Sequence, residues 1–158
     1  METVPVTSDA VRSAMACFAT GVVVITASGP SGPVGMAVNS FTSVSLDPPL
    51  VLFCASHSSN TWPWIKAAGH FCANVLSARQ EGLARAFAAR GDRYLGVAHH
   101  RGVSGAPVLD NAHAHVDCEI AEEHDAGDHI VVFGRVLDVS MDWGRSPLLF
   151  YRSRYWLL

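Results

Sequence analysis

The chain has 158 residues, about one domain's worth of protein and enough to bury a single hydrophobic core. Its formal net charge of −3 argues against a nucleic-acid-binding protein, which normally carries a basic face. Hydrophobic residues make up 49% of the chain and charged residues 16%, which excludes a disordered protein and predicts an apolar surface buried between copies in a homo-oligomer.

The N-terminal segment lacks the features of a signal peptide or a membrane anchor. Residues 1–9 have no basic start and no apolar core, and no stretch of the chain approaches the ~18 uninterrupted apolar residues of a membrane span. The four cysteines lie far apart and form no CxxC pair, which favours four buried thiols over a zinc knuckle. We therefore expect a cytoplasmic protein that contacts no membrane.

Alternating β-rich and turn-rich segments predict one mainly β domain over 1–158, with 1–12 as a loosely ordered arm. The expected elements are a helix at 8–18, strands at 20–27, 34–42 and 50–55, a helix at 61–68, a strand at 70–76, a helix from 77 to about 91, and strands at 112–124, 129–141, 148–151 and 154–157. The short link at 125–128 is typical of a hairpin turn. Since such links join antiparallel strands, we expect a closed or nearly closed β-barrel with peripheral short helices.

Capping residues set the expected helix ends. Ser8 or Asp9 is expected to cap the first helix, and Thr61 the second. Ser77 and Gln80 have the spacing of a capping box at the start of the third helix, for which Gly91 is the natural stop.

Several motifs of common enzyme classes are missing from the sequence. There is no GxGxxG, no GxxxxGK[ST], no HExxH and no GxSxG. Among the eight histidines, His113 and His115 have the i, i+2 spacing that places two ligands on one face of a strand, but spacing indicates no third ligand. We therefore interpret them as solvent-facing strand histidines and predict no metal site.

Seven segments, taken in order, resemble the short-chain flavin reductases of the FMN-binding split-barrel fold. They are FATGVVVIT at 18–26, GMAVNSFTSVSLDPPL at 35–50, SNT at 59–61, FCANVL at 71–76, GDH at 127–129, FGRV at 133–136 and PLLFY at 147–151. The resemblance covers the chain from about residue 13 and implies a split β-barrel with Greek-key-like antiparallel strands. It also implies a homodimer that reduces flavin for a separate monooxygenase.

The resemblance implies two stretches that bind flavin. The first is an extended backbone with small polar side chains that reads the pyrimidine edge, formed by Met36, Ala37, Val38, Asn39 and Ser40. The second is a hydroxyl-rich loop that cradles the flavin phosphate at a helix N-terminus, through Ser56, Ser59 and Thr61. The alternative for the loop is that its hydroxyls only cap the helix. Members of the family often have Thr or Ser where this chain has Ala37, so one side-chain contact is missing.

Four further residues are candidates for the same site. Asn74 lies in an otherwise apolar strand and needs a partner, either flavin or backbone. Arg93, with Arg90 on the other side of Gly91, is expected near the outer flavin or the nucleotide, and solvated surface arginines are the alternative. The resemblance places His129 where nicotinamide approaches the flavin, as the catalytic residue, the alternative being a bond to its own turn. Tyr151 is a candidate contact that is equally typical of a core or interface aromatic residue.

These expectations describe an NAD(P)H:flavin oxidoreductase that passes a hydride from the nicotinamide to the flavin. The flavin carries the difficult chemistry, which is consistent with the lack of a catalytic dyad motif. The sequence leaves open FMN or FAD as flavin, and NADH or NADPH as hydride donor. Two other functions also remain open: a non-catalytic flavin- or heme-binding carrier, and an FMN-dependent oxidase of a small substrate.

Overall fold

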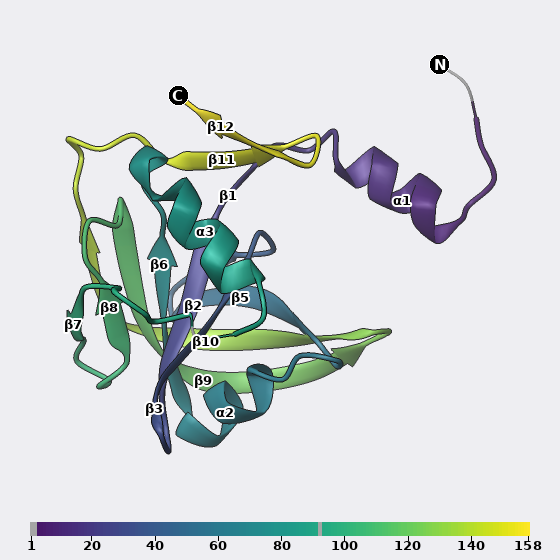
Figure 1. Ribbon diagram of the computed structural model, residues 1–158. Coiled ribbons are helices and arrows are strands. Elements are labelled where there is room, and N and C mark those ends of the chain that lie inside the picture. Colours follow the sequence, from purple (N-terminus) through teal and green to yellow (C-terminus); the bar gives the residue numbers. More distant parts are fainter. Residues whose placement is uncertain (1–2, 92) are drawn as a thin grey trace.

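The computed structural model describes residues 3–91 and 93–158. Seven strands form one antiparallel sheet in the order β3-β2-β6-β9-β10-β5-β4 (Figure 1). Their bounds are β2 (Val23–Gly29), β3 (Gly32–Val38), β4 (Thr42–Leu46), β5 (Pro49–Ser56), β6 (His70–Val75), β9 (Ala114–Ala126) and β10 (His129–Met141). Two small sheets accompany it, one of β1 (Thr20–Gly21), β11 (Leu148–Tyr151) and β12 (Arg154–Leu157), the other of β7 (His99–Arg101) and β8 (Pro107–Leu109). The helices are α1 (Ser8–Met15), α2 (Trp62–Ala68) and α3 (Glu81–Ala88), the last preceded by the 3₁₀ turn η1 (Ala78–Gln80).

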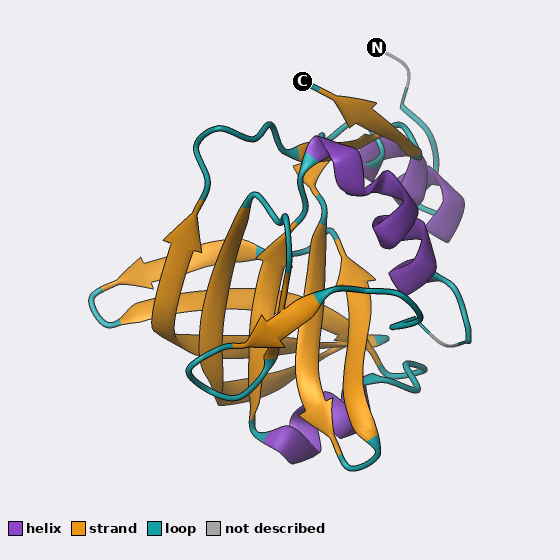
Figure 2. Ribbon diagram, turned by 60° about the vertical axis from the view of Figure 1, so that its left-hand side comes forward, coloured by secondary structure: helices purple, strands orange, loops and turns teal. Residues whose placement is uncertain are grey.

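The large sheet curls into a nearly closed barrel. Figure 2 shows the strands of its two halves crossing each other. β6 joins the hairpins β2–β3 and β9–β10 by pairing with both β2 and β9. The third hairpin, β4–β5, joins the sheet through β5, which pairs with β10. The edge strands β3 and β4 are connected by residues 39–41, and no ladder pairs them in the described part of the chain. The expected mainly β architecture with antiparallel strands is confirmed.

Aromatic side chains fill the barrel interior. Phe53 of β5 packs edge-on against Phe71 of β6 and Trp62 of α2, with ring centroids 5.1 and 6.0 Å apart. All three side chains are buried, as is Ile65 on the next turn of α2. Burying each large apolar side chain stabilises the fold by about 1.5–3 kcal/mol, so this cluster fixes α2 against the barrel.

A second hydrophobic cluster holds α3 against β3. Phe87 is fully buried in it and packs edge-on against Tyr94, with ring centroids 5.0 Å apart. The close approach requires a glycine at position 35, because a Cβ atom on Gly35 would lie 2.7 Å from Cε1 of Phe87. The C-terminal end of α3 is thereby held beside β3.

The expected strand at 34–42 is wrong in its second half. β3 ends at Val38, and Thr42 begins a separate strand, β4, that pairs with β5. Between them the Ser40 hydroxyl takes a ladder partner's place: the Cys54 N–H donates to Ser40 Oγ at 2.9 Å. The continuous run of strand-forming residues gives no indication of this corner in the sequence, because the corner depends on a hydrogen bond to the side chain of Ser40. The strand at 20–27 is likewise divided, into β1 and β2, at Val22.

Helix ends differ from the expectations at three places. Thr7, not Ser8 or Asp9, caps α1, because its hydroxyl accepts the Ala10 N–H at 3.1 Å. α1 ends at Met15, buries no residue and projects from the barrel in Figure 1. Residues 3–12 of the expected arm therefore include part of a helix; residues 1 and 2 lie outside the described residues. α3 ends at Ala88, before Gly91.

The capping box and the long hairpin are confirmed. Ser77 and Gln80 form the reciprocal capping box, with the Ser77 N–H donating to Gln80 Oε1 at 2.9 Å. The hairpin turn is shorter than expected: the strands continue through Asp125 and Ala126, so Gly127, with φ of 68°, and Asp128 make the whole turn. A two-residue turn with a glycine at positive φ suits the twist of antiparallel strands.

All four cysteines are free thiols, but they are not all buried. Cys72 and Cys118 are buried, Cys54 is partly buried and Cys17 is exposed. Cys17 is exposed because α1, which precedes it, does not pack on the barrel. No helix in the described part of the chain is long and apolar enough to span a membrane.

Candidate active site

A cleft of about 450 Å³ opens where the end of β3, the end of β5 and the start of β10 meet below the end of α3. Its size is within the range of small-molecule sites. It is lined by Met36, Ala37, Val38, Asn39, Ser40, Cys54, Ala55, Ser56, Ser58, Ser59, Asn60, Phe87, Ala88, Arg90, Arg93 and His129. The structure thus brings together eight of the proposed flavin-binding residues with His129.

Strand register brings His129 to the cleft. His129 lies opposite Ser56 in the β10–β5 ladder, although 73 positions separate them in the sequence. Its Nδ1 is 2.7 Å from Oδ1 of Asp128, and the His57 N–H holds the turn by donating to the Asp128 carbonyl at 3.0 Å. The hydrogen bond with His129 and its charge lower the pKa of the Asp128 carboxyl, so this partner is ionised at neutral pH. His129 therefore contacts its own turn, as the alternative expected, and also lines the cleft.

Because Nδ1 is engaged, Nε2 is the ring nitrogen left to meet a ligand. It has no hydrogen-bond partner among the described residues, and the His129 side chain is 44% exposed. A pairing of Nδ1 with a carboxylate orients an imidazole and favours the proton on Nδ1.

The loop after β5 presents hydroxyl groups to the cleft. Ser56 Oγ and Ser58 Oγ lie 2.9 Å apart, and the Ser58 N–H donates to Ser56 Oγ at 3.2 Å. Both side chains border the cleft beside Asn60. Clustered hydroxyls of this kind donate well to phosphate oxygens.

The start of α2 does not offer the free N–H groups expected of it. Ser59 Oγ already accepts the Thr61 N–H at 3.2 Å and the Trp62 N–H at 3.1 Å, and the next residue, Pro63, has no N–H. Ser59 therefore caps the helix in place of Thr61, whose side chain makes no capping hydrogen bond. The capping alternative holds for Ser59, while Ser56 and Ser58 keep their hydroxyls toward the cleft.

Thr61 points to a neighbouring hollow instead of the cleft. Its Oγ1 accepts a hydrogen bond from Arg93 Nη1 at 2.8 Å, and the same nitrogen donates to the Gly35 carbonyl at 2.6 Å. Arg93 Nε donates to the Ala89 carbonyl at 2.8 Å. Partial burial lowers the pKa of the Arg93 guanidinium. Arg93 thus ties the end of α3 to β3 and α2, while it also borders the cleft.

The charge of the cleft suits an anionic ligand. Two arginines, Arg90 and Arg93, line one end, and no carboxylate is among the described lining residues. The side chain of Asn39 is exposed and has no hydrogen-bond partner among the described residues. The opposite wall, formed by residues 36–38, is largely backbone and apolar. Flavin mononucleotide has the matching parts: an anionic phosphate, a polar chain and a flat ring system.

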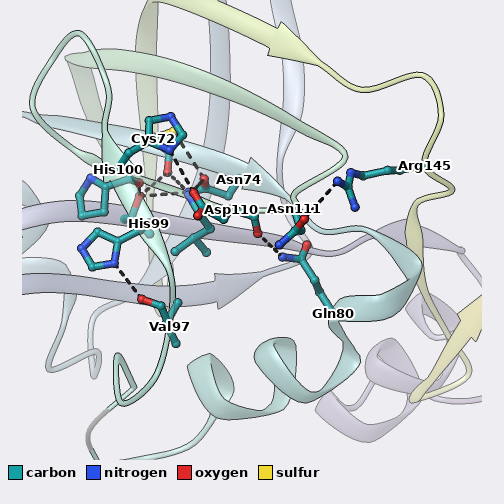
Figure 3. Close-up of polar contacts among 12 residues, drawn as sticks. Cys72, Asn74, Gln80, Val97, His99, His100, Asp110, Asn111 and Arg145 are labelled. Atoms are coloured by element: carbon teal, nitrogen blue, oxygen red, sulfur yellow. Dashed lines mark hydrogen bonds and ion pairs between the residues drawn. The ribbon is translucent and has the colours of Figure 1, made fainter.

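Asn74 lies outside the cleft, in the core beside Cys72 (Figure 3). Its Nδ2 donates to the Val24 carbonyl at 3.2 Å and to Thr26 Oγ1 at 3.0 Å, and its Oδ1 accepts the Leu109 N–H at 2.7 Å. The side chain is fully buried. The flavin-binding role expected for Asn74 is therefore wrong, and the alternative of backbone partners is found, because the side chain substitutes for ladder bonds where β8 meets β2 and β6.

Tyr151 also lies away from the cleft. Its ring packs against Trp156, with centroids 6.3 Å apart, and under the Arg152 guanidinium. Its neighbour Phe150 instead lines, with Tyr155, a separate hollow of about 200 Å³. This hollow shares four lining residues with the cleft: Ala37, Val38, Asn39 and Ala88. Adjacent residues of a strand face opposite sides, so Phe150 and Tyr151 of β11 cannot both face this hollow.

Sequence reasoning also missed Cys54, Ala55, Ser58, Asn60, Phe87 and Ala88 as lining residues. Ser58 and Asn60 belong to the same polar loop and were recoverable from it. No sequence signal marked Cys54, Ala55, Phe87 and Ala88, because each lies in an apolar run typical of a protein core.

Metal ligands do not gather anywhere in residues 3–91 and 93–158: no group of three or more His, Cys, Asp or Glu side chains lies close enough to hold an ion. His115 faces Asp138, with Nε2 3.4 Å from Oδ2, and His113 precedes β9.

Known proteins are similar to this chain in sequence and in fold. The model of the flavin reductase like domain matches residues 15–156. The chain is 42% identical to the reductase subunit HsaB of a flavin-dependent monooxygenase from Rhodococcus jostii, over 91% of this chain and 74% of the relative. It is 43% identical to the NADH-dependent FMN reductase SmoA of Agrobacterium fabrum, over 90% of this chain and 82% of the relative. The solved structure of the NADH:FAD oxidoreductase SgcE6 of Streptomyces globisporus superposes with a TM-score of 0.93 at 37% identity, covering 100% of this chain and 98% of that one. The chain therefore belongs to the flavin reductase-like family, and the split-barrel fold and flavin-reducing function implied by its sequence are confirmed.

Proposed function

We propose that the chain is an NAD(P)H-dependent flavin reductase that takes FMN or FAD as its flavin and delivers reduced flavin to a separate monooxygenase. The observation that carries the proposal is the cleft itself: an extended backbone wall, a hydroxyl loop and two arginines enclose it, and His129 stands at its rim. The arrangement has a place for a flat ring, a phosphate and an approaching nicotinamide.

Each group has a distinct role in this proposal. Residues 36–40 contact the ring and its polar edge through backbone atoms and Asn39. Ser56 and Ser58 donate to the phosphate, and Arg90 provides a positive charge beside it. Arg93 positions the phosphate end by holding β3, α2 and the end of α3 together.

When bound, flavin supplies the ability to accept a hydride, so the protein needs only to orient the rings and exclude water. The ring of His129 orients the approaching nicotinamide amide through Nε2 and holds or releases a proton at that atom. Asp128 keeps the imidazole turned into the cleft. An open cleft, lined on one wall by backbone, allows flavin to leave after reduction, which delivery to a second enzyme requires.

The names of the relatives support the choice of hydride donor and of recipient. SmoA is named for FMN and NADH, and SgcE6 for FAD and NADH, so NADH is the proposed donor. HsaB is named as the reductase subunit of a monooxygenase, which supports a monooxygenase as the recipient of reduced flavin.

We also propose that two copies form a homodimer in the cytoplasm. Val11, Met15 and Phe18, on α1 and just after it, are 50–66% exposed, and an interface would bury them. Four free thiols are consistent with a reducing compartment.

The test is NADH or NADPH oxidation at 340 nm by purified protein, with added FMN, FAD or riboflavin. Turnover that rises and saturates with free flavin is the expected result. Flavin binding without turnover would instead identify a carrier, and a tightly held flavin that reacts with a small substrate would identify an oxidase. Heme binding in place of flavin binding would also overturn the proposal.

A further inference from the structure

A second hollow, of about 370 Å³, adjoins the arginine end of the cleft. It shares Asn60, Arg90 and Arg93 with the cleft, so the two spaces meet where the flavin phosphate is proposed to lie. Its remaining walls are Pro33, Val34, Gly35, Thr61, Trp64, Gly91 and Tyr94. A mononucleotide in the cleft leaves this second hollow unused.

Trp64 gives the hollow an exposed aromatic surface. The two tryptophans of α2 contrast sharply: Trp62 is 4% exposed and packs in the barrel, whereas Trp64 is 49% exposed and borders the hollow. Exposed indole faces stack well on nucleobases, since every base has a π-face.

Positive charge stands between Trp64 and the cleft. Arg93 is committed to backbone and hydroxyl acceptors, but Arg90 has no ion pair or side-chain hydrogen bond with any described residue. No carboxylate is among the described residues that line either space. An uncommitted guanidinium at the junction of two hollows suits a pyrophosphate.

The floor of the hollow is rigid. Tyr94 packs edge-on against Phe87, and its hydroxyl donates to the Val34 carbonyl at 3.1 Å. Arg93 is anchored to Gly35 on the same strand. A preformed floor lowers the entropy cost of ordering a ligand there.

From these observations we propose that the second hollow binds the adenylate group of a dinucleotide, with its base on Trp64 and its phosphate beside Arg90. This inference rests on the proposed flavin reductase function and extends it from the flavin head to the whole dinucleotide. FAD continues from the phosphate end of the cleft directly into the hollow; the adenylate of NADH has the same chemistry. The protein accordingly prefers the adenylate-bearing dinucleotide to the mononucleotide.

The test compares Trp64→Ala with Trp143→Ala, a matched control because Trp143 is 83% exposed and borders neither space. Dissociation constants for FAD and FMN are measured by flavin fluorescence without nicotinamide, and the KM for NADH is then measured with FMN. Trp64→Ala is expected to weaken FAD binding about tenfold, as for loss of one base-stacking contact, and to leave FMN binding within about twofold. Trp64→Phe is expected to restore most of the loss.

The source of the adenylate follows from which constant moves. A selective loss for FAD identifies flavin dinucleotide, whereas unchanged flavin binding with a raised KM for NADH identifies the nicotinamide dinucleotide. Equal weakening of FAD and FMN, or no change in any constant, overturns the proposal.

Adenosine provides a second test on the unaltered protein. It is expected to raise the apparent dissociation constant of FAD, or to inhibit competitively against NADH, and to leave FMN binding unchanged. If adenosine neither weakens FAD binding nor competes with NADH, the proposal is contradicted, even if the Trp64 variants do not fold. By contrast, an unaltered protein that binds FAD with this selectivity but oxidises no NADH with any flavin would contradict the proposed function alone.

Discussion

Two regions of the barrel have polar side chains beside strands: in one these side chains are hydrogen-bonded within the protein, and in the other they are left without partners among the described residues. In the core, the Asn74 amide is hydrogen-bonded to Val24, Thr26 and Leu109 and has no exposed surface. In the cleft, Asn39 and Arg90 have no side-chain partners among the described residues. The first region uses polarity to join strands, and the second leaves it available to a ligand.

The comparison shows that a polar residue within a strand does not by itself indicate a binding site. A buried amide needs partners wherever it lies, and the chain can supply them at a corner of the sheet where ladders are interrupted. Unsatisfied donors next to a concave surface are the stronger indication.

The largest effect is expected from Asn74→Ala. The substitution leaves the buried Leu109 N–H without an acceptor and removes the bonds donated to Val24 and Thr26, so we expect unfolding free energy to fall by about 3 kcal/mol. Urea unfolding measures the loss, and FMN binding by the folded fraction is expected to be unchanged. The matched control is Asn39→Ala, which is expected to weaken FMN binding with little change in stability. The reverse pattern would show that the two asparagines have been assigned to the wrong regions.

Replacing His129 by Ala is expected to lower kcat/KM for flavin reduction at least tenfold, because Nε2 is lost from the rim of the cleft. Flavin binding without nicotinamide is expected to change less than threefold. His124→Ala is the control on the same hairpin, since His124 pairs with Glu122 and packs against Phe133 instead of lining the cleft. Stopped-flow reduction separates the binding step from the chemical step. Full activity of His129→Ala would remove the residue from the mechanism.

A smaller effect, about fivefold, is expected on FMN binding from the double substitution Ser56→Ala and Ser58→Ala, which removes two hydroxyl donors. Riboflavin has no phosphate, so its binding is expected to be unchanged, and fluorescence titration measures both. Ser43→Ala is a control that leaves the cleft intact, because Ser43 is exposed on β4 and does not line the cleft. An equal loss for riboflavin and FMN would move the phosphate to another part of the cleft.

Sequence patterns predicted the parts of the fold that local chemistry decides. The capping box at Ser77, the glycine turn at Gly127 and the final two strands depend on neighbours in the chain, and all were found. The corner at Ser40 was missed because its hydrogen bond comes from Cys54, on another strand.

The candidate site divides in the same way. The polar loop and residues 36–40 were predicted as contiguous segments and His129 through the resemblance, and the structure gathers them around one cleft. Their role in flavin binding stays a prediction. Asn74 was misplaced because nothing in its own strand reveals that Leu109 supplies a partner. Phe87 was missed because its approach to the cleft depends on Gly35, which lies on another element.

Thiol labelling gives the finest test of the contrast, because one cysteine lies in the cleft and two lie in the core. Burial raises the pKa of the Cys118 thiol to about 12, with the nearby Asp117 carboxylate adding to the shift, and burial also raises the pKa of Cys72 well above its usual range. At pH 8 both thiols are protonated and inaccessible, so neither is expected to react until the protein unfolds. Exposed Cys17 is expected to react fastest, and partly buried Cys54 more slowly. Because Cys54 lines the cleft, FMN is expected to slow its labelling and to leave that of Cys17 unchanged, as peptide mass spectrometry can measure. Labelling of Cys54 that ignores saturating FMN would show that the flavin lies elsewhere, whatever the activity of the protein.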